Sequence, residues 1–258
     1  MFQRFAALGD SFTEGLSDQR SDGTFRGWAD MVAVRLAQDN PELDYINLAV
    51  RGKKLRQVAT EQVPVAVDWN PDLISIGAGA NDIIRLSTDV ATLGRLAHAT
   101  LGRLADSGAR VVVFSGFDPR IRIPLTQRSG ARAEQFNESI RRSARYFDAT
   151  LVDLWDLPRL YEDSMWAPDK LHLTPAGHAL IADAVLAALG IRSDTVPPAN
   201  TTMADPDRWE DARWFVRDVI PWMYRGMIGR SSGDGMDPKY PYPVRPAKWS
   251  SASETQDV

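Results

Sequence analysis

Residues 8–15 read Leu8-Gly9-Asp10-Ser11-Phe12-Thr13-Glu14-Gly15 and follow directly on the apolar run 5–8. The apolar run predicts a β-strand, which Gly9 ends abruptly in a tight turn. Such a turn holds the Ser11 hydroxyl at the end of the strand, where backbone N–H groups can face a developing negative charge. A serine after a Gly-Asp turn is also a common N-cap of a helix, so this stretch by itself leaves both interpretations open.

The composition is that of an ordinary globular protein. The 258 residues are 44% hydrophobic and 25% charged, with a formal net charge of −4. This charge gives no reason to expect a nucleic-acid partner. The sequence has no cysteine, which excludes disulfides, thiolate metal sites and a cysteine nucleophile. No signal-like N-terminal segment or membrane-length apolar stretch is seen, so we expect a cytoplasmic protein without stable membrane insertion. The oligomeric state stays open.

Short apolar segments alternate with helical patterns over the first three quarters of the chain. The predicted strands are residues 5–8, 45–50, 72–76, 110–114 and 150–154, and the predicted helices are 28–38, 55–67, 88–106, 131–147 and 174–189. Strands alternating with helices form a parallel sheet that is covered on both faces. Right-handed crossovers then give an α/β fold, a three-layer α/β/α sandwich with a five-stranded parallel sheet of the flavodoxin-like kind.

The composition changes after residue 191. Residues 195–207 form a polar loop, residues 209–229 are rich in aromatic and basic side chains, and residues 238–246 are rich in proline. We therefore divide the chain into a domain of residues 1–191 and a C-terminal extension of residues 192–258. We expect the aromatic segment to be a helix that packs on the domain; a lid, a dimer contact and a membrane-surface helix are the alternatives.

A carboxylate and a histidine are paired in Asp169-Lys170-Leu171-His172, just before the last predicted helix. A carboxylate three residues before a histidine can accept a hydrogen bond from its Nδ1. That contact fixes the tautomer and leaves Nε2 free to act as a base. The other two histidines, His98 and His178, lie in predicted helices, and we interpret both as structural.

Four short blocks together resemble the SGNH hydrolase superfamily, also called the GDSL esterases and lipases. The blocks are Gly9-Asp10-Ser11-Phe12, Gly52 after Asn47, Gly79-Ala80-Asn81-Asp82, and Asp169-x-x-His172. They occur in the order of the family and span nearly all of residues 4–191. Phe12 departs mildly from the family, which usually has leucine there. The resemblance implies that residues 1–191 are a catalytic domain.

The resemblance also implies a role for each site residue. Ser11 is expected to be the nucleophile, His172 its general base, and Asp169 the residue that orients His172. The implied oxyanion hole comprises the Ser11 and Gly52 backbone N–H groups and the Asn81 side-chain amide. Asp10 and Asp82 are expected to be structural, holding their loops by hydrogen bonds to the backbone.

These roles predict a serine ester hydrolase that works through an acyl-enzyme, with neither a cofactor nor a metal. The expected substrates are small-molecule or carbohydrate esters with a short or medium acyl group. Two alternatives remain open at this point. One is an acyltransferase of the same fold, in which an alcohol replaces water. The other is a non-catalytic, flavodoxin-like binding module.

Overall fold

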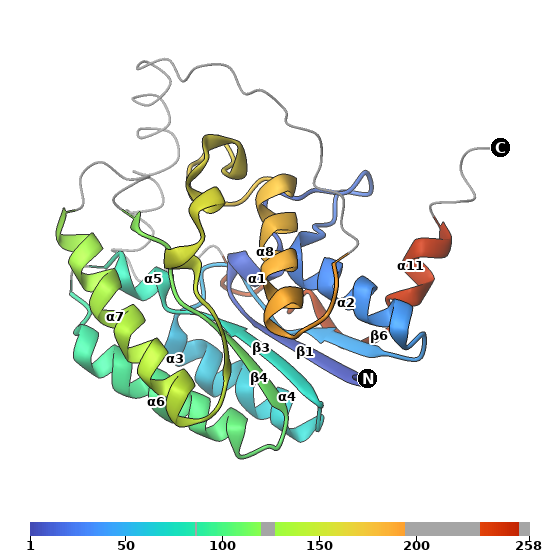
Figure 1. The fold of residues 1–258 in the computed structure, drawn as a ribbon, viewed down its shortest axis with the longest axis horizontal. Coiled ribbons are helices and arrows are strands. Elements are labelled where there is room, and N and C mark those ends of the chain that lie inside the picture. Colours follow the sequence, from blue (N-terminus) through green and yellow to red (C-terminus); the bar gives the residue numbers. More distant parts are fainter. Residues whose placement is uncertain (86, 120–126, 194–232, 253–258) are drawn as a thin grey trace.

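A central β-sheet organises the computed structural model, which describes residues 1–85, 87–119, 127–193 and 233–252 (Figure 1). Its strand order is β5-β4-β3-β1-β2-β6. The strands are β1 (Arg4–Gly9), β2 (Asp44–Asn47), β3 (Leu73–Gly77), β4 (Arg110–Phe114), β5 (Thr150–Val152) and β6 (Tyr240–Val244). Strands β1 to β5 are parallel, as predicted, and β6 is antiparallel to β2. The predicted fold class is confirmed, with a sixth strand that the sequence analysis did not anticipate.

The connections between the parallel strands are mostly helical. The helices are α1 (Ser11–Glu14), α2 (Gly27–Asp39), α3 (Leu55–Gln57), α4 (Val63–Asp68), α5 (Ala80–Ile83), α6 (Val90–Ala105), α7 (Gln127–Tyr146), α8 (Pro175–Ala188) and α11 (Ala247–Ala252). A π-helical turn, Val58–Gln62, joins α3 to α4, so the single helix predicted over 55–67 is irregular in its middle. Three 3-10 turns (Leu154–Asp156, Pro158–Tyr161 and Asp163–Met165) follow β5.

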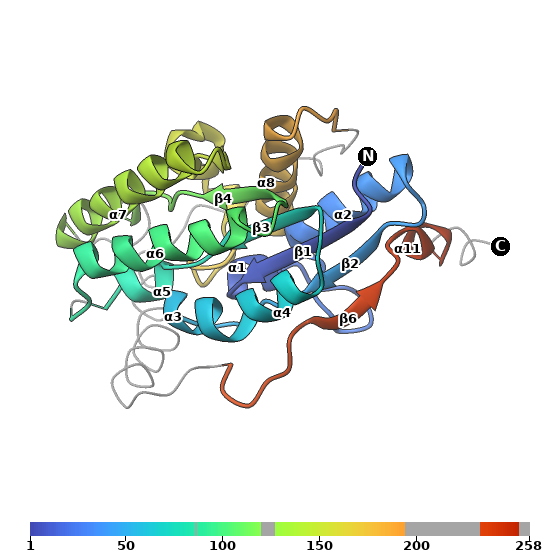
Figure 2. The same ribbon diagram turned by 90° about the horizontal axis from the view of Figure 1, so that it is seen from below.

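Two apolar layers enclose the sheet, because successive residues of a strand face opposite sides. In β1, Phe5 and Ala7 belong to the core beneath α2 and α8, whereas Ala6 and Leu8 belong to the core beneath α4 and α6. All four are at most 1% exposed. Figures 1 and 2 show these two helical layers on either side of the strands. The three-layer sandwich thus follows from mostly apolar strands, such as β1 and β3, that are buried on both faces.

The described part of the C-terminal extension is packed against the domain. Strand β6 pairs with β2, and Lys239 just before it donates a hydrogen bond of 3.0 Å from Nζ to Asp30 Oδ1. The two side chains are 7% and 0% exposed, so this ion pair is buried. The predicted aromatic helix over 209–229 lies outside the described residues. Within the described ranges, no helix has the length and apolar character needed to cross a membrane.

Candidate active site

The turn after β1 positions Ser11 as the first residue of α1. The Asp10 side chain caps that helix by accepting a hydrogen bond of 3.1 Å from the Phe12 N–H. Gly9 has a φ of +151°, and a Cβ there would lie 2.4 Å from the Gly77 carbonyl oxygen of β3. Only glycine therefore allows β1 and β3 to end this close together. The N-cap is Asp10, so the interpretation of Ser11 as a helix cap is wrong; Ser11 begins α1 just after the end of β1.

Gln62 clamps this turn from the far side, a role that the sequence analysis missed. Its side chain accepts a hydrogen bond of 2.8 Å from the Gly9 N–H and donates one of 2.9 Å to the Gly9 carbonyl oxygen. Gln62 is 4% exposed, and a buried polar side chain needs hydrogen-bond partners. In the sequence it follows Thr60 and Glu61, so no local pattern singled it out.

The carboxylate–histidine pair forms as predicted from the spacing. Asp169 Oδ2 lies 2.6 Å from His172 Nδ1, and Asp169 Oδ1 accepts hydrogen bonds from the Leu171 and His172 N–H groups. Burial by itself would raise the pKa of Asp169, but the hydrogen bond and charge of His172, with these N–H groups, lower the pKa overall. An ionised Asp169 fixes the imidazole tautomer with its proton on Nδ1, so Nε2 is the free basic nitrogen.

The loop after β2 carries Gly52, whose φ of +74° lies in the left-handed region. Glu14 holds this loop. Its carboxylate accepts a hydrogen bond of 2.7 Å from the Arg51 N–H and also pairs with the Arg51 guanidinium. Glu14 is 7% exposed, so this contact is largely sheltered from water. Asp82 fixes the end of the same loop by accepting a hydrogen bond of 2.9 Å from the Leu55 N–H. The structural roles expected for Asp10 and Asp82 are therefore confirmed.

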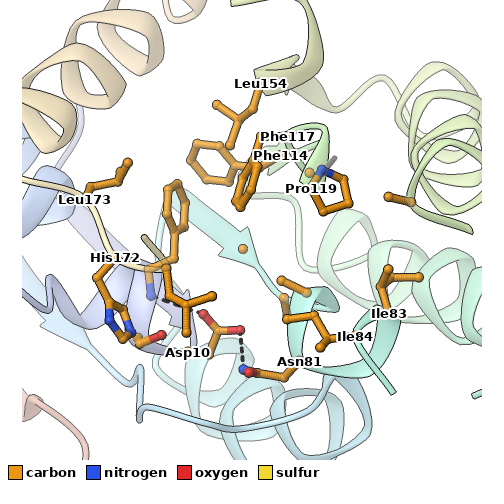
Figure 3. A pocket seen from close by; sticks show the side chains of 18 of the residues that line it. Asp10, Asn81, Ile83, Ile84, Phe114, Phe117, Pro119, Leu154, His172 and Leu173 are labelled. Atoms are coloured by element: carbon orange, nitrogen blue, oxygen red, sulfur yellow. Dashed lines mark hydrogen bonds between the residues drawn. The ribbon is translucent and has the colours of Figure 1, made fainter. Parts of the chain in front are cut away.

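Asn81 lies near Asp10 at the start of α5, and both hydrogens of its side-chain amide are engaged. The amide donates to Asp10 Oδ2 at 2.9 Å (Figure 3) and to the Lys53 carbonyl oxygen at 3.0 Å. Both acceptors are oxygens, which fixes the orientation of the amide with its nitrogen facing them. Burial raises the pKa of Asp10 to about 7, although the Phe12 N–H and the charge of His172 act in the opposite direction.

One cavity of about 220 Å³ brings the predicted site residues together, and Ser11, Gly52, Asn81 and His172 all line it. Figure 3 shows His172 and Asp10 at one end of this cavity and Phe114, Phe117 and Leu154 at the other. The carboxyl ends of β1, β3 and β4 meet here, which is the edge where open parallel sheets bind ligands. Asp169 touches the cavity only through His172.

The two remaining histidines have different surroundings. His98 is exposed on α6, where its Nδ1 lies 3.1 Å from Ser143 Oγ, and it does not line the cavity. His178 is 1% exposed, accepts a hydrogen bond at Nδ1 from the Trp28 N–H, and donates from Nε2 to the Leu16 carbonyl oxygen. Burial lowers the pKa of His178 to about 4, which keeps the ring neutral. Within the described ranges, no cluster of three or more His, Cys, Asp or Glu side chains could hold a metal ion.

A comparison with family models matches residues 7–180 to the GDSL-like Lipase/Acylhydrolase family. The chain belongs to this family. The match spans all four blocks that carried the resemblance, so the SGNH assignment is confirmed. The GDSL-family chain is accordingly a serine ester hydrolase. A comparison with curated proteins finds no match.

Solved structures share the fold of this chain. One is LAE5, an alpha/beta hydrolase enzyme from the metagenome of Lake Arreo, Spain, with 22% identity and a TM-score of 0.62 over 74% of this GDSL-family chain and 97% of its own. Another is Axe2, an acetylxylan esterase from Geobacillus stearothermophilus, with 18% identity and a TM-score of 0.61 over 74% of this chain and 97% of its own. At these identities, the likeness establishes the fold alone.

Proposed function

We propose that Ser11, His172 and Asp169 form the catalytic triad of this ester hydrolase. The observation that carries the proposal is the 2.6 Å contact between Asp169 Oδ2 and His172 Nδ1, beside a cavity that Ser11 also lines. A histidine oriented in this way presents Nε2 as a base, and the serine at the strand end is the nucleophile in the same cavity.

In the proposed reaction, Ser11 Oγ attacks the ester carbonyl carbon while His172 Nε2 accepts the hydroxyl proton. The C–O bond to the alcohol then breaks, and the imidazolium returns that proton to the departing oxygen. Water repeats the sequence on the acyl-enzyme, giving up a proton to His172 and releasing the acid and free Ser11. Asp169 stabilises the imidazolium through both halves of the reaction.

We further propose that the Ser11 and Gly52 backbone N–H groups and the Asn81 amide stabilise the anionic intermediate. Removing one such donor typically costs about 3 kcal/mol of transition-state stabilisation. Both hydrogens of the Asn81 amide already bind Asp10 and the Lys53 carbonyl oxygen, so this amide is not free to bind the oxyanion as it stands. The amide must share or exchange one of these bonds when the oxyanion forms, and catalytic hydrogen bonds often tighten only in the reacting complex.

The proposed substrates are esters of a small or carbohydrate alcohol with a short or medium acyl group. Similarity of fold to an acetylxylan esterase is consistent with a carbohydrate ester. The proposed catalytic domain comprises residues 1–191, with residues 192–258 as its extension. The proposed chemistry requires only the side chains and backbone groups named above, without a cofactor or a metal.

Labelling and turnover test the triad together. A fluorophosphonate should modify Ser11, and both labelling and p-nitrophenyl acetate hydrolysis should be lost in Ser11→Ala. His172→Ala should lose most of the turnover, whereas the matched variant His98→Ala should keep it, because His98 is exposed on α6. Hydrolysis that persists in Ser11→Ala would refute the mechanism. Product analysis with an added alcohol would then distinguish transfer from hydrolysis.

A further inference from the structure

The end of the cavity farther from His172 is strongly apolar. We call this region the apolar arm and define it by Ile83, Ile84, Phe114, Phe117, Ala133 and Phe136. These side chains come from the end of α5, the end of β4 with the loop that follows it, and α7, and Figure 3 shows the labelled ones surrounding the space above Asp10 and Asn81. Phe114, Phe136 and Ala133 are each at most 7% exposed, so the walls belong to the protein core.

The polar side chains bordering the apolar arm are already hydrogen-bonded within the protein. Ser115 donates to Asp153 Oδ1 at 2.6 Å. Asn137 accepts from the Gly116 N–H at 2.7 Å and donates to the Gly116 carbonyl oxygen at 2.8 Å. A sugar hydroxyl placed in this arm would lose its water without gaining these groups as partners, which is unfavourable. The arm therefore suits the hydrocarbon part of an ester and disfavours a carbohydrate.

We infer that the apolar arm binds the acyl chain of the substrate and that the enzyme prefers straight acyl groups longer than acetyl. The cavity has a volume of about 220 Å³, of which the arm is only a part, because Ser11, Gly52 and His172 line the rest. A chain that reaches into the arm buries its methylene groups against apolar side chains, and an acetyl group has no methylene group to bury. The inference rests on the proposed function, because it takes Ser11 as the atom to which the acyl group is attached.

The decisive experiment measures kcat/KM of the full chain on p-nitrophenyl esters from acetate to dodecanoate. We expect kcat/KM to rise about fourfold for each methylene buried in the arm, and to level off or fall once the chain is longer than the arm. The leaving group is constant across the series, so the trend reports the acyl site. Highest activity on acetate with a steady fall along the series would overturn the inference and leave the ester hydrolase intact.

Two variants of arm residues should shift the optimum in opposite directions. Ala133→Phe fills the arm and should lower the hexanoate-to-acetate ratio of kcat/KM at least tenfold, while Phe136→Leu enlarges it and should move the optimum to longer chains. Ala91→Phe, at an exposed position of α6, is the matched control and should leave the ratio unchanged. An unchanged ratio in a folded Ala133→Phe would contradict the inference.

A labelling measurement on the unmodified protein tests the same inference without a variant, so its result does not depend on whether a variant folds. In the unmodified protein, a hexyl fluorophosphonate should label Ser11 at least tenfold faster than a methyl one, and equal rates would overturn the inference. If neither reagent labels Ser11 and no ester is hydrolysed, the proposed function itself fails and the inference falls with it. Labelling without chain-length preference leaves the proposed function standing and removes only the acyl arm.

Discussion

His178 should make the stability of this protein depend on pH in a way that a single substitution can isolate. The ring is 1% exposed and is fixed between the Trp28 N–H, 3.3 Å from Nδ1, and the Leu16 carbonyl oxygen, 3.0 Å from Nε2. Because Nδ1 accepts and Nε2 donates, the folded protein requires the neutral ring. Protonation would place a hydrogen on Nδ1 against the Trp28 N–H and a charge in a buried site.

The size of the effect follows from the two pKa values. Burial lowers the pKa of His178 from 6.5 to about 4 in the folded protein. In the unfolded chain, His178 therefore binds a proton below about pH 6.5. In the folded protein, it binds this proton only near pH 4. The contribution of His178 to stability is therefore fully present above about pH 6.5 and is lost as the pH falls toward about 4. Between about pH 7.5 and about pH 5, the loss amounts to roughly 2 kcal/mol.

Asp10 opposes this trend in the unmodified protein. Burial raises its pKa from 3.8 to about 7, so the folded protein binds a proton before the unfolded chain does. Its contribution to stability therefore increases as the pH falls from about 7 toward 3.8, by an amount similar to the loss at His178. The pH profile of the unmodified protein alone would hide both effects. The comparison must be made between two variants at the same pH.

The assay is urea unfolding of the unmodified protein and of His178→Gln at about pH 7.5 and about pH 5. Glutamine does not titrate and retains an amide donor for the Leu16 carbonyl oxygen, so any lost packing is the same at both pH values. The destabilisation caused by His178→Gln should be smaller at the lower pH by roughly 2 kcal/mol. An equal penalty for His178→Gln at both pH values would refute the reasoning.

Two further predictions concern the C-terminal extension. Lys239→Met should cost about 3 kcal/mol in urea unfolding, because it leaves the buried Asp30 carboxylate without one of its charged partners, and a loss below 1 kcal/mol would contradict a buried pair. Gly233→Ala places a Cβ 2.1 Å from the Arg51 carbonyl oxygen. The resulting shift of the loop after β2 should lower kcat roughly tenfold or more. Gly235→Ala places a Cβ that meets nothing within 4 Å, although the φ of +77° strains the backbone there, so it should keep most of its turnover; equal activity of the two variants would speak against a link to the site.

The local features of this site were readable from the sequence, because each depends on near neighbours. Asp169 and His172 are three residues apart, so the spacing alone predicted a contact that the structure has at 2.6 Å. Thr174 and Pro175 predicted the start of α8, and the Thr174 hydroxyl does accept a hydrogen bond from the Gly177 N–H. Spacings of this kind need no knowledge of tertiary structure.

Strand β6 shows where that reasoning stops. The segment Tyr240-Pro241-Tyr242-Pro243-Val244 was interpreted only as part of a proline-rich tail. In the structure, Tyr240 is paired with Asn47 and Val244 with Tyr45 of β2. Pro241 and Pro243 lie at the alternate positions of β6, whose backbone nitrogens face away from β2. Their lack of an N–H therefore costs no hydrogen bond to β2. They therefore suit an outer strand, because an edge without free N–H groups resists pairing with other chains.

The loops of the site are held by partners far away in the sequence, and no local pattern could have named them. Gln62 clamps Gly9 across 53 positions. Glu14 clamps Arg51 across 37 positions. In each case a buried side chain fixes the backbone of a neighbouring loop. Ser11 and Gly52 were recognised from short local motifs, but they are held in position by contacts with residues distant in the sequence. An oxyanion hole depends on donors that are already in place before charge develops. Substitutions at Gln62 or Glu14 should therefore lower turnover, although neither residue lines the cavity.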